Sequence, residues 1–163
     1  MALAYIALGS NLRDPMHEVG QAMTELDTLP ETRLVKASSL YCTAPVGYDN
    51  QPDFINAVAA IDTGLEPMAL LQAILDLENR HGRERPFPNA PRVLDLDLLL
   101  YEQVVMNTPA LTLPHPRMHQ RGFVLLPLAE IAPELHIAGY GSVADLAKQC
   151  ADQGVVLLQE QST

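Results

Sequence analysis

The hydrophobic residues of this chain follow two spacings, one typical of strands and one typical of helices. Residues 3–8 form a short apolar run that ends at a Gly-Ser-Asn turn, which predicts a first strand. Residues 33–41 and 54–62 predict two more strands, separated by a polar loop rich in Pro and Gly. The run VLDLDLLLY over residues 93–101 is typical of a central, largely buried strand.

Two amphipathic stretches predict helices between these strands. The first opens at Asp14-Pro15, because Asp suits the N-cap of a helix and Pro suits its first turn. The second opens at Glu66-Pro67 and stops at Gly82, since glycine favours the C-terminal end of a helix. Both stretches repeat apolar residues at intervals of three or four, so each helix has one face for the core.

The order strand–helix–strand–strand–helix–strand predicts an α+β fold of the ferredoxin-like βαββαβ sandwich type. In that fold an antiparallel sheet carries both helices on one face and leaves the other face free for a ligand. Residues 121–132 and 142–151 predict two further helices, and the tail over 155–159 predicts either a strand or an extra packed segment. With 163 residues, no repeat and no linker, we expect a single domain spanning residues 1–163.

Composition and charge narrow the class of protein. Hydrophobic residues make up 48% of the chain and no apolar run approaches the roughly 20 residues that span a bilayer. The N-terminus lacks the basic region of a signal peptide, and Cys42 and Cys150 are too few for a disulfide framework or a metal cage. We therefore expect a soluble, cytoplasmic protein. The net charge of −10 argues against nucleic acid or an anionic membrane as a partner.

The positive charges are nevertheless concentrated in one part of this acidic chain. Between residues 80 and 121 there are six of the ten cations, all arginines, against four acidic residues. Arginine pairs bidentately with phosphate and keeps its charge when partly buried, so the cluster indicates a site for a small polyanion. A set of solvated surface arginines is the alternative.

The most specific pattern is Asp95-Leu96-Asp97 within the apolar strand. Side chains alternate along a strand, so the two carboxylates are expected on one face and the leucines on the other. Two neighbouring carboxylates repel each other, and a hard divalent cation would compensate them. Because Mg²⁺ is usually held by one or two carboxylates plus substrate phosphates, the pair favours a nucleotide–metal complex. Simple polar alternation on a solvated strand face is the alternative.

Arginines and a histidine flank this pattern. Arg92 precedes the strand, and Arg83 and Arg85 lie in the Pro-rich loop before it, where they could meet charge on a transferring phosphoryl group. The chain has no GxxxxGK[ST] loop, so side chains and metal would have to hold ATP. His115 lies between two prolines and is well placed to contact a ligand, although a turn-capping histidine is the alternative. The other histidines are interpreted as ordinary surface or helix-end residues: His17, His81, His119 and His136.

These patterns together resemble the 6-hydroxymethyl-7,8-dihydropterin pyrophosphokinase family. The likeness runs through AYIALGSNL, SSLYCTAPVG, QPDFINAV, LDLDLLLY and LPHPRMHQRGFVL, in that order along nearly the whole chain. It implies transfer of the β,γ-diphosphate of ATP to the pterin's hydroxymethyl oxygen, with release of AMP, in folate biosynthesis. It also implies the ferredoxin-like fold, two Mg²⁺ ions, ATP and the pterin as small-molecule substrates, and a monomer.

The resemblance also assigns site residues. Asp95 and Asp97 match the metal ligands, and Arg83 and Arg92 match the catalytic arginines of the loop. The positions that match ATP contacts are Glu78, Arg85, Leu98, Thr112, His115 and Arg121. The positions that match the pterin site are Thr43, Val46, Phe54, Asn56 and Phe123. Aromatic rings and an amide suit a flat heterocycle with many donors and acceptors, although core packing is the alternative for the two phenylalanines.

The chain departs from the family pattern in places, and two rival functions remain open. The loop before Arg92 reads PFPNAPR and lacks the Arg-Trp pair common in close relatives, with Phe87 as a candidate replacement for the ring. Leu75, Ala110 and Pro116 replace polar or aromatic nucleotide contacts. One rival is a non-catalytic ferredoxin-like module that binds a small regulator, and the other is a Mg²⁺-dependent transferase with a different acceptor. Paired aspartates disfavour the first rival, and the pterin-facing residues disfavour the second.

Overall fold

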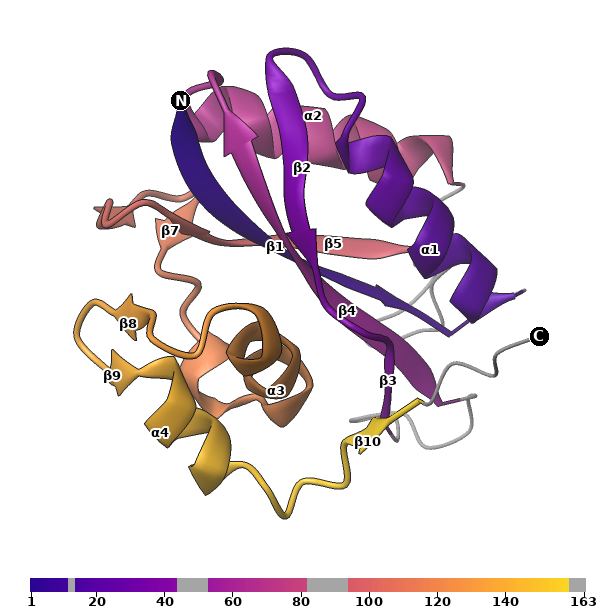
Figure 1. Ribbon diagram of the computed structural model, residues 1–163. Coiled ribbons are helices and arrows are strands. Elements are labelled where there is room, and N and C mark those ends of the chain that lie inside the picture. Colours follow the sequence, from indigo (N-terminus) through magenta and orange to yellow (C-terminus); the bar gives the residue numbers. More distant parts are fainter. Residues whose placement is uncertain (12–13, 44–52, 82–93, 159–163) are drawn as a thin grey trace.

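The computed structural model describes residues 1–11, 14–43, 53–81 and 94–158. In chain order the elements are β1 (Ala2–Ser10), α1 (Pro15–Leu26), β2 (Thr32–Ala37), β3 (Tyr41–Thr43), β4 (Phe54–Thr63), α2 (Pro67–Arg80), β5 (Asp95–Tyr101), β6 (Met106–Asn107), β7 (Thr112–Leu113), the 3-10 turn η1 (Met118–Gln120), α3 (Gly122–Ile131), β8 (His136–Ile137), β9 (Gly141–Ser142), α4 (Val143–Gln149) and β10 (Val156–Leu157). The strands and helices are shown in Figure 1.

One antiparallel sheet organises the molecule (Figure 1). Its strands follow the order β10-β3-β4-β1-β5, and β2 also pairs with β4. The long strand β4 pairs with β1 along one side and with β3 and then β2 along the other. Strand β5 pairs with β1 and ends the sheet. The predicted α+β class with an antiparallel sheet is confirmed.

The first two helices lie on one face of this sheet, as predicted. Helix α1 begins with Pro15, and the carboxylate of Asp14 accepts a hydrogen bond from the His17 backbone N–H at 3.4 Å. Helix α2 begins with Pro67 and ends at Arg80. The predicted stop at Gly82 lies outside the described residues. The two helices and the sheet share one buried core, to which they contribute Ile6, Leu8, Val19, Leu26, Ile61, Leu70, Ile74 and Leu77.

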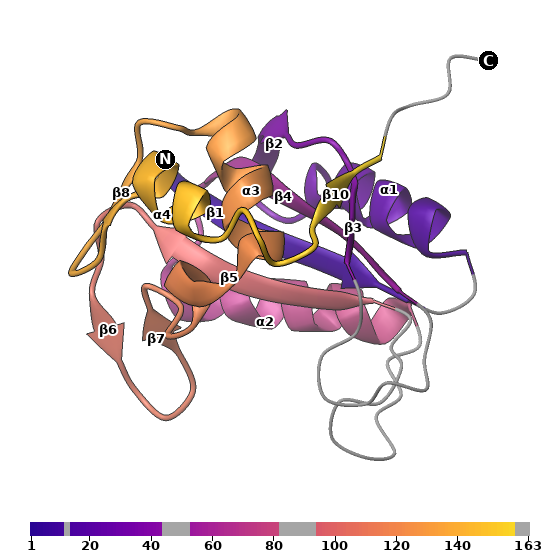
Figure 2. The ribbon, with the colours of Figure 1, turned by 90° about the horizontal axis from the view of Figure 1, so that it is seen from below.

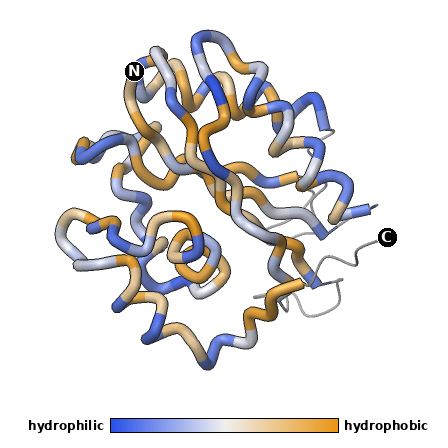
Figure 3. The backbone as a smooth tube through the Cα atoms, in the orientation of Figure 1, coloured by the Kyte–Doolittle hydropathy of each residue, from blue (hydrophilic) through white to orange (hydrophobic). Residues whose placement is uncertain are grey.

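Helices α3 and α4 cover part of the opposite face, where they form a second core with Tyr5, Val58 and Ala60 (Figure 1). The prediction of helices on one face only, with the other face free for a ligand, is therefore wrong for the part under α3. The reason lies in α3 itself, whose sequence GFVLLPLAEI is apolar nearly all round. Such a helix is stable only when it is covered on both sides, here by the sheet and by α4. Figure 3 shows this concentration of hydrophobic residues in α3 and in the central strands.

The predicted strand over residues 33–41 is divided into β2 and β3. At the division, the backbone N–H of Val58 donates to the Ser38 side-chain hydroxyl at 2.9 Å, so a hydroxyl replaces a backbone carbonyl in the ladder. The Ser38 N–H still donates to the carbonyl of Val58 at 2.9 Å. The break lets β3 pair with a different part of β4 and end beside the site described below.

The C-terminal part confirms both predicted helices as α3 and α4. The tail forms a strand, β10, which lies along the edge of β3 with Val156 opposite Cys42 (Figure 2). The short hairpins β6–β7 and β8–β9 were not predicted. Among the described residues, no helix is both long and apolar enough to cross a membrane.

His81 differs from its interpretation as an ordinary residue. It lies at the C-cap of α2, as a helix-end residue, but its side chain is only 6% exposed. Its Nδ1 lies 2.6 Å from Glu18 Oε2 and its Nε2 lies 2.5 Å from Glu25 Oε1, so the ring joins α2 to α1. Burial lowers the pKa of His81, but the hydrogen bonds that the ring donates to the Glu18 and Glu25 carboxylates, together with their charges, outweigh burial and raise that pKa above its usual value.

Candidate functional site

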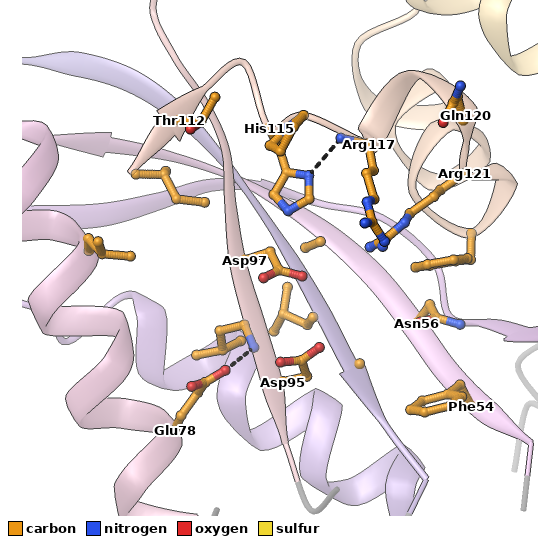
Figure 4. Close-up of a pocket in the computed structure, with 18 of the residues that line it drawn as sticks. Phe54, Asn56, Glu78, Asp95, Asp97, Thr112, His115, Arg117, Gln120 and Arg121 are labelled. Atoms are coloured by element: carbon orange, nitrogen blue, oxygen red, sulfur yellow. Dashed lines mark hydrogen bonds between the residues drawn. The ribbon is translucent and has the colours of Figure 1, made fainter. Parts of the chain in front are cut away.

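A cleft of about 980 Å³ wraps around strand β5 beside the start of α3 (Figure 4). Because β5 is the last strand of its sheet, the cleft extends from the sheet face to helix α2. From the sheet it is lined by Gly9, Thr43, Phe54, Asn56, Asp95, Asp97 and Leu98. From the other elements it is lined by Leu71, Leu75, Glu78, Ala110, Thr112, His115, Arg117, Gln120, Arg121, Phe123, Gln153 and Val155.

The two aspartates lie in the middle of this cleft. Alternation along β5 puts Leu96 and Leu98 in the core under the helices, whereas Asp95 and Asp97 are half-buried and line the cleft. Figure 4 shows both carboxylates projecting from the same side of the strand. The structure thus brings the two carboxylates together as the sequence pattern predicts.

Glu78 holds the backbone between these aspartates. Its side chain comes from α2, is 2% exposed, and its Oε2 accepts a hydrogen bond from the Leu96 backbone N–H at 2.6 Å (Figure 4). A buried backbone N–H left without an acceptor costs free energy comparable to a lost hydrogen bond, and Glu78 supplies that acceptor to Leu96. Glu78 therefore fixes the part of β5 from which Asp95 and Asp97 project.

His115 and helix α2 lie on opposite sides of β5 (Figure 4). Two hydrogen bonds with backbone groups hold His115 in place. Its own N–H donates to the carbonyl of Leu99 at 2.9 Å, and its Nδ1 accepts from the Arg117 backbone N–H at 3.3 Å. Burial lowers the pKa of His115 and the charge of Arg121 lowers it further, against a smaller opposing effect of Asp95. The ring is therefore neutral at pH 7, and because Nδ1 accepts, Nε2 carries the proton.

Two arginines supply positive charge to the part of the cleft that His115 lines. The guanidinium groups of Arg117 and Arg121 extend toward one another in the cleft (Figure 4). Neither forms an ion pair with any residue in the described part of the chain. The Cζ atom of Arg121 lies 5.5 Å from the centre of the Phe123 ring, within the range of a cation–π contact. Guanidinium groups without a carboxylate partner in a cleft suit an anionic ligand such as phosphate.

The sheet face of the cleft carries a buried amide. Asn56 Nδ2 donates to the hydroxyl of Thr43 at 2.9 Å, and both residues are buried. A Cβ atom at Gly9 would lie 3.1 Å from Asn56 Oδ1, so glycine leaves the space that the amide occupies. Phe54 and Phe123 also line this part of the cleft. A fixed amide with aromatic neighbours suits a flat heterocycle.

Comparison with known proteins identifies this arrangement. The family model described as 7,8-dihydro-6-hydroxymethylpterin-pyrophosphokinase (HPPK) matches residues 5–133. The chain belongs to the HPPK family. It is 43% identical over 151 residues to the 2-amino-4-hydroxy-6-hydroxymethyldihydropteridine pyrophosphokinase of Pseudomonas aeruginosa, covering 93% of each chain. It is also 43% identical over 158 residues to the same enzyme of Haemophilus influenzae, covering 97% of this chain and 99% of that protein.

Solved structures support the fold of this HPPK. An HPPK-DHPS chain of Plasmodium falciparum, solved with pterin and p-hydrobenzoate, superposes with a TM-score of 0.70 at 14% identity. The wild-type HPPK-DHPS of the same organism, solved with pteroate, gives a TM-score of 0.72 at 14% identity. Both matches cover 91% of this chain, but only 44% and 42% of those longer chains. At this identity the likeness concerns the fold alone.

The family gives the reaction. This HPPK transfers a pyrophosphoryl group from ATP to hydroxymethyldihydropterin in folate synthesis. The rival interpretations, a non-catalytic regulatory module and a transferase with another acceptor, are therefore wrong.

Every predicted site residue that the structure describes lines the one cleft: Thr43, Phe54, Asn56, Glu78, Asp95, Asp97, Leu98, Thr112, His115, Arg121 and Phe123. The remaining predicted residues lie outside the described residues: Val46, Arg83, Arg85 and Arg92, together with Phe87 of the altered loop. The described residues of this set thus come from five separate stretches of chain.

Some residues of the cleft were not predicted as site residues. Arg117 belongs to the arginine cluster, so its charge was a usable signal, but the resemblance did not assign it a role. Gln153 and Val155 come from the C-terminal tail, and no sequence signal connects them with residues near position 121. Their place in this HPPK cleft depends on how the tail returns to the sheet as β10.

Proposed function

We propose that the diphosphate transfer takes place beside Asp95 and Asp97, between a pterin on the sheet face and ATP on the side of α2 and His115. The observation that carries the proposal is that the two aspartates, the Thr43–Asn56 pair and the arginines Arg117 and Arg121 line one cleft. In-line transfer requires acceptor and donor to meet at such a point.

Asp95 and Asp97 fit Mg²⁺ by their chemistry. They offer hard carboxylate oxygens on one side of a strand, open to the cleft. The part of the chain that the structure describes contains no cluster of three or more potential metal-ligating side chains. Two carboxylates suit an ion that takes its other ligands from phosphates and water. When bound, Mg²⁺ would neutralise charge on the phosphate oxygens of ATP.

The pterin is proposed to lie against Asn56. Asn56 donates one Nδ2 hydrogen to Thr43. Its second Nδ2 hydrogen and its Oδ1 would recognise the edge of the pterin ring. Phe54 and Phe123 would pack on its faces, and Val46 is proposed, from the family resemblance, to line its rim. This set orients the hydroxymethyl group toward the aspartates.

ATP is proposed to lie along the other side of β5. Leu98 and Thr112 line the part of the cleft near α2, and the neutral His115 offers its Nε2–H as a donor. Arg121 would contact the phosphates, and Arg83, Arg85 and Arg92 of the preceding loop would complete their neutralisation. These arginines act through charge and position, which suffices for a loose phosphoryl-transfer transition state.

We also infer that the core is ferredoxin-like. The strand order β5-β1-β4-β2, with α1 and α2 on one face, supports this topology. The α3–α4 layer and the two short hairpins are then additions to it. A single domain over residues 1–163 and a monomeric state remain predictions.

A test of the residue assignments measures AMP release from ATP with hydroxymethyldihydropterin and Mg²⁺. We expect Asp97→Asn to lower turnover by at least about a hundredfold with an unchanged unfolding midpoint, because it removes a charged metal ligand and no core group. The matched control is Asp145→Asn, since Asp145 is exposed on α4 and does not line the cleft. Near wild-type turnover of Asp97→Asn at saturating Mg²⁺ would disprove the metal assignment.

A further inference from the structure

The C-terminal tail makes a two-point contact with the start of α3. The backbone N–H of Gly122 donates to Gln153 Oε1 at 2.8 Å, and Gln153 Nε2 donates to the backbone carbonyl of Gln120 at 2.9 Å. These two backbone groups stand on either side of Arg121. One side-chain amide therefore holds the peptide units before and after that residue.

The contact replaces an ordinary helix cap. Gly122 is the first residue of α3, and Arg121 at the N-cap position makes no side-chain capping bond. The first N–H groups of a helix have no partner within the helix. Gln153 supplies an acceptor for one of them from 31 residues away in sequence.

Close packing fixes the tail against this point. A Cβ atom at Gly122 would lie 3.1 Å from Gln153 Oε1, 3.2 Å from Val155 Cγ2 and 3.3 Å from Cys150 Cβ. The absence of a side chain at Gly122 therefore lets the tail approach the backbone closely. Beyond this contact the tail joins the sheet as β10, which anchors it at its other end.

Two cleft residues flank the clamped glycine. Arg121 and Phe123 both line the cleft, and they stand in cation–π contact with each other. A rotation of the backbone at Gly122 would move the guanidinium and the ring together. The direction of both side chains thus depends on the backbone geometry around Arg121, which the two hydrogen bonds of Gln153 help to fix.

We propose that Gln153 is a positioning residue for the transfer reaction, which fixes the backbone around Arg121 and thereby aims Arg121 at ATP and Phe123 at the pterin. This inference rests on the ATP contact proposed for Arg121. Gln153 lies outside residues 5–133, the stretch that matches the family model. Preorganised groups lower the barrier because they need no rearrangement when substrate binds.

The test uses Gln153→Met, which keeps the length of the side chain and removes both hydrogen bonds. The matched control is Gln149→Met, since Gln149 is exposed at the end of α4 and does not line the cleft. Affinity for a non-hydrolysable ATP analogue with Mg²⁺ is measured by calorimetry, and hydrogen exchange is measured at the Gly122 amide. We expect Gln153→Met to weaken binding of the analogue about tenfold and to speed exchange at Gly122, and to lower the unfolding midpoint only slightly, so that the variant stays folded under the assay conditions. Gln149→Met should change neither the affinity for the analogue nor the exchange rate of the Gly122 amide.

A double-mutant cycle with Arg121→Ala shows whether Gln153 acts through Arg121. We expect Gln153→Met to have no further effect on analogue affinity once Arg121 is alanine. Equal losses in both backgrounds, or no loss in the single variant, would overturn the positioning role while leaving Arg121 assigned to ATP. No loss from Arg121→Ala itself would overturn the assignment of Arg121 and the role of Gln153 with it. Gln153→Glu, which keeps the acceptor for Gly122 but not the donor to Gln120, should give an intermediate loss.

Discussion

At the scale of single residues, Glu78 shows how a site residue acquires a role that its sequence position does not reveal. The family resemblance places it among the nucleotide contacts. In the structure its carboxylate accepts a hydrogen bond from the Leu96 N–H and so supports the strand that carries Asp95 and Asp97. A hydrogen bond between residues 18 positions apart and on different elements leaves no trace in periodicity or local propensity.

We expect Glu78→Ala to lower the free energy of unfolding by about 1–3 kcal/mol, because the Leu96 N–H would remain buried without an acceptor. Glu78→Gln retains an oxygen that can accept this bond, so its loss should be clearly smaller. Urea unfolding followed by circular dichroism measures both. Equal stability of the alanine variant and the wild type would contradict the supporting role.

Thr43 tests the proposed pterin wall. We expect Thr43→Val, which keeps the shape of the side chain, to weaken pterin binding about fivefold to tenfold, since Asn56 loses the acceptor that orients its amide. ATP-analogue affinity should not change. Fluorescence titration with the pterin and calorimetry with the analogue give the two constants.

The matched control for that prediction lies at the far end of β4. Thr63 is 1% exposed, and its hydroxyl lies 2.7 Å from the hydroxyl of Thr32. The Thr63 hydroxyl also accepts a hydrogen bond from the Leu65 N–H at 3.1 Å, so Thr63→Val removes two part-buried hydrogen bonds away from the cleft. It should cost stability without a change in pterin affinity. A similar loss of pterin binding in both variants would mean that the effect comes from the strand and not from Asn56.

At the scale of elements, helices α1 and α2 are joined through a titratable contact. The charged groups that face the His81 ring are Glu18 and Glu25 of α1, each within hydrogen-bond distance of one ring nitrogen. Both nitrogens donate only when the ring is protonated. The link is therefore strongest in the charged form.

Stability should fall with rising pH because of this contact. The folded state raises the pKa of His81 above 6.5, so the contribution is fully present below pH 6.5 and is lost as the pH rises through the folded-state pKa. We expect the stability difference between wild type and His81→Gln, about 1 kcal/mol at low pH, to shrink as the pH rises. Urea unfolding over a pH series measures it.

His136→Gln provides the comparison, because His136 is exposed on β8 and away from α1 and α2. Its stability difference from wild type should not follow the same pH dependence. A His81→Gln difference that stays constant across the series would contradict the charged link.

The elements also show what the sequence could predict. Both N-terminal helices begin where Pro15 and Pro67 indicate, because caps are local chemistry. The division between β2 and β3 could not be predicted, since it depends on the Ser38 hydroxyl meeting Val58 across the sheet. The aspartate pair followed from strand alternation alone, whereas Gln153 required the path of the tail. Local patterns thus gave the elements and the centre of the site, and tertiary contacts gave its supports.

At the scale of the whole molecule, two cores share one sheet. The core under α1 and α2 and the core under α3 and α4 take alternate residues of the same strands, for example Ile6 and Tyr5 of β1. If the strands separated from either pair of helices by unfolding, the core under the other pair would also be exposed to water. We therefore propose that residues 1–163 fold as one cooperative unit.

We expect urea unfolding to give a single transition, with the same midpoint by circular dichroism and by tyrosine fluorescence, since the chain has no tryptophan. Sedimentation velocity on the same samples should give one species of about the 17.8 kDa chain mass, consistent with a monomer. Two separate transitions would mean that the α3–α4 layer unfolds independently, and a larger species would contradict the monomer.

The alternation of side chains along β5 has a consequence for how this enzyme can diverge. Leu96 and Leu98 turn toward the core under the helices, whereas Asp95 and Asp97 turn to the opposite side of the strand and into the cleft, so successive residues of one strand face different surroundings. Leu75 and Ala110 line the cleft from α2 and from the turn between β6 and β7, whereas the Thr43–Asn56 hydrogen bond belongs to the sheet, so a change at either of the first two positions leaves that bond in place. Side chains on one side of β5 can therefore be changed without altering what the side chains on the other side contact.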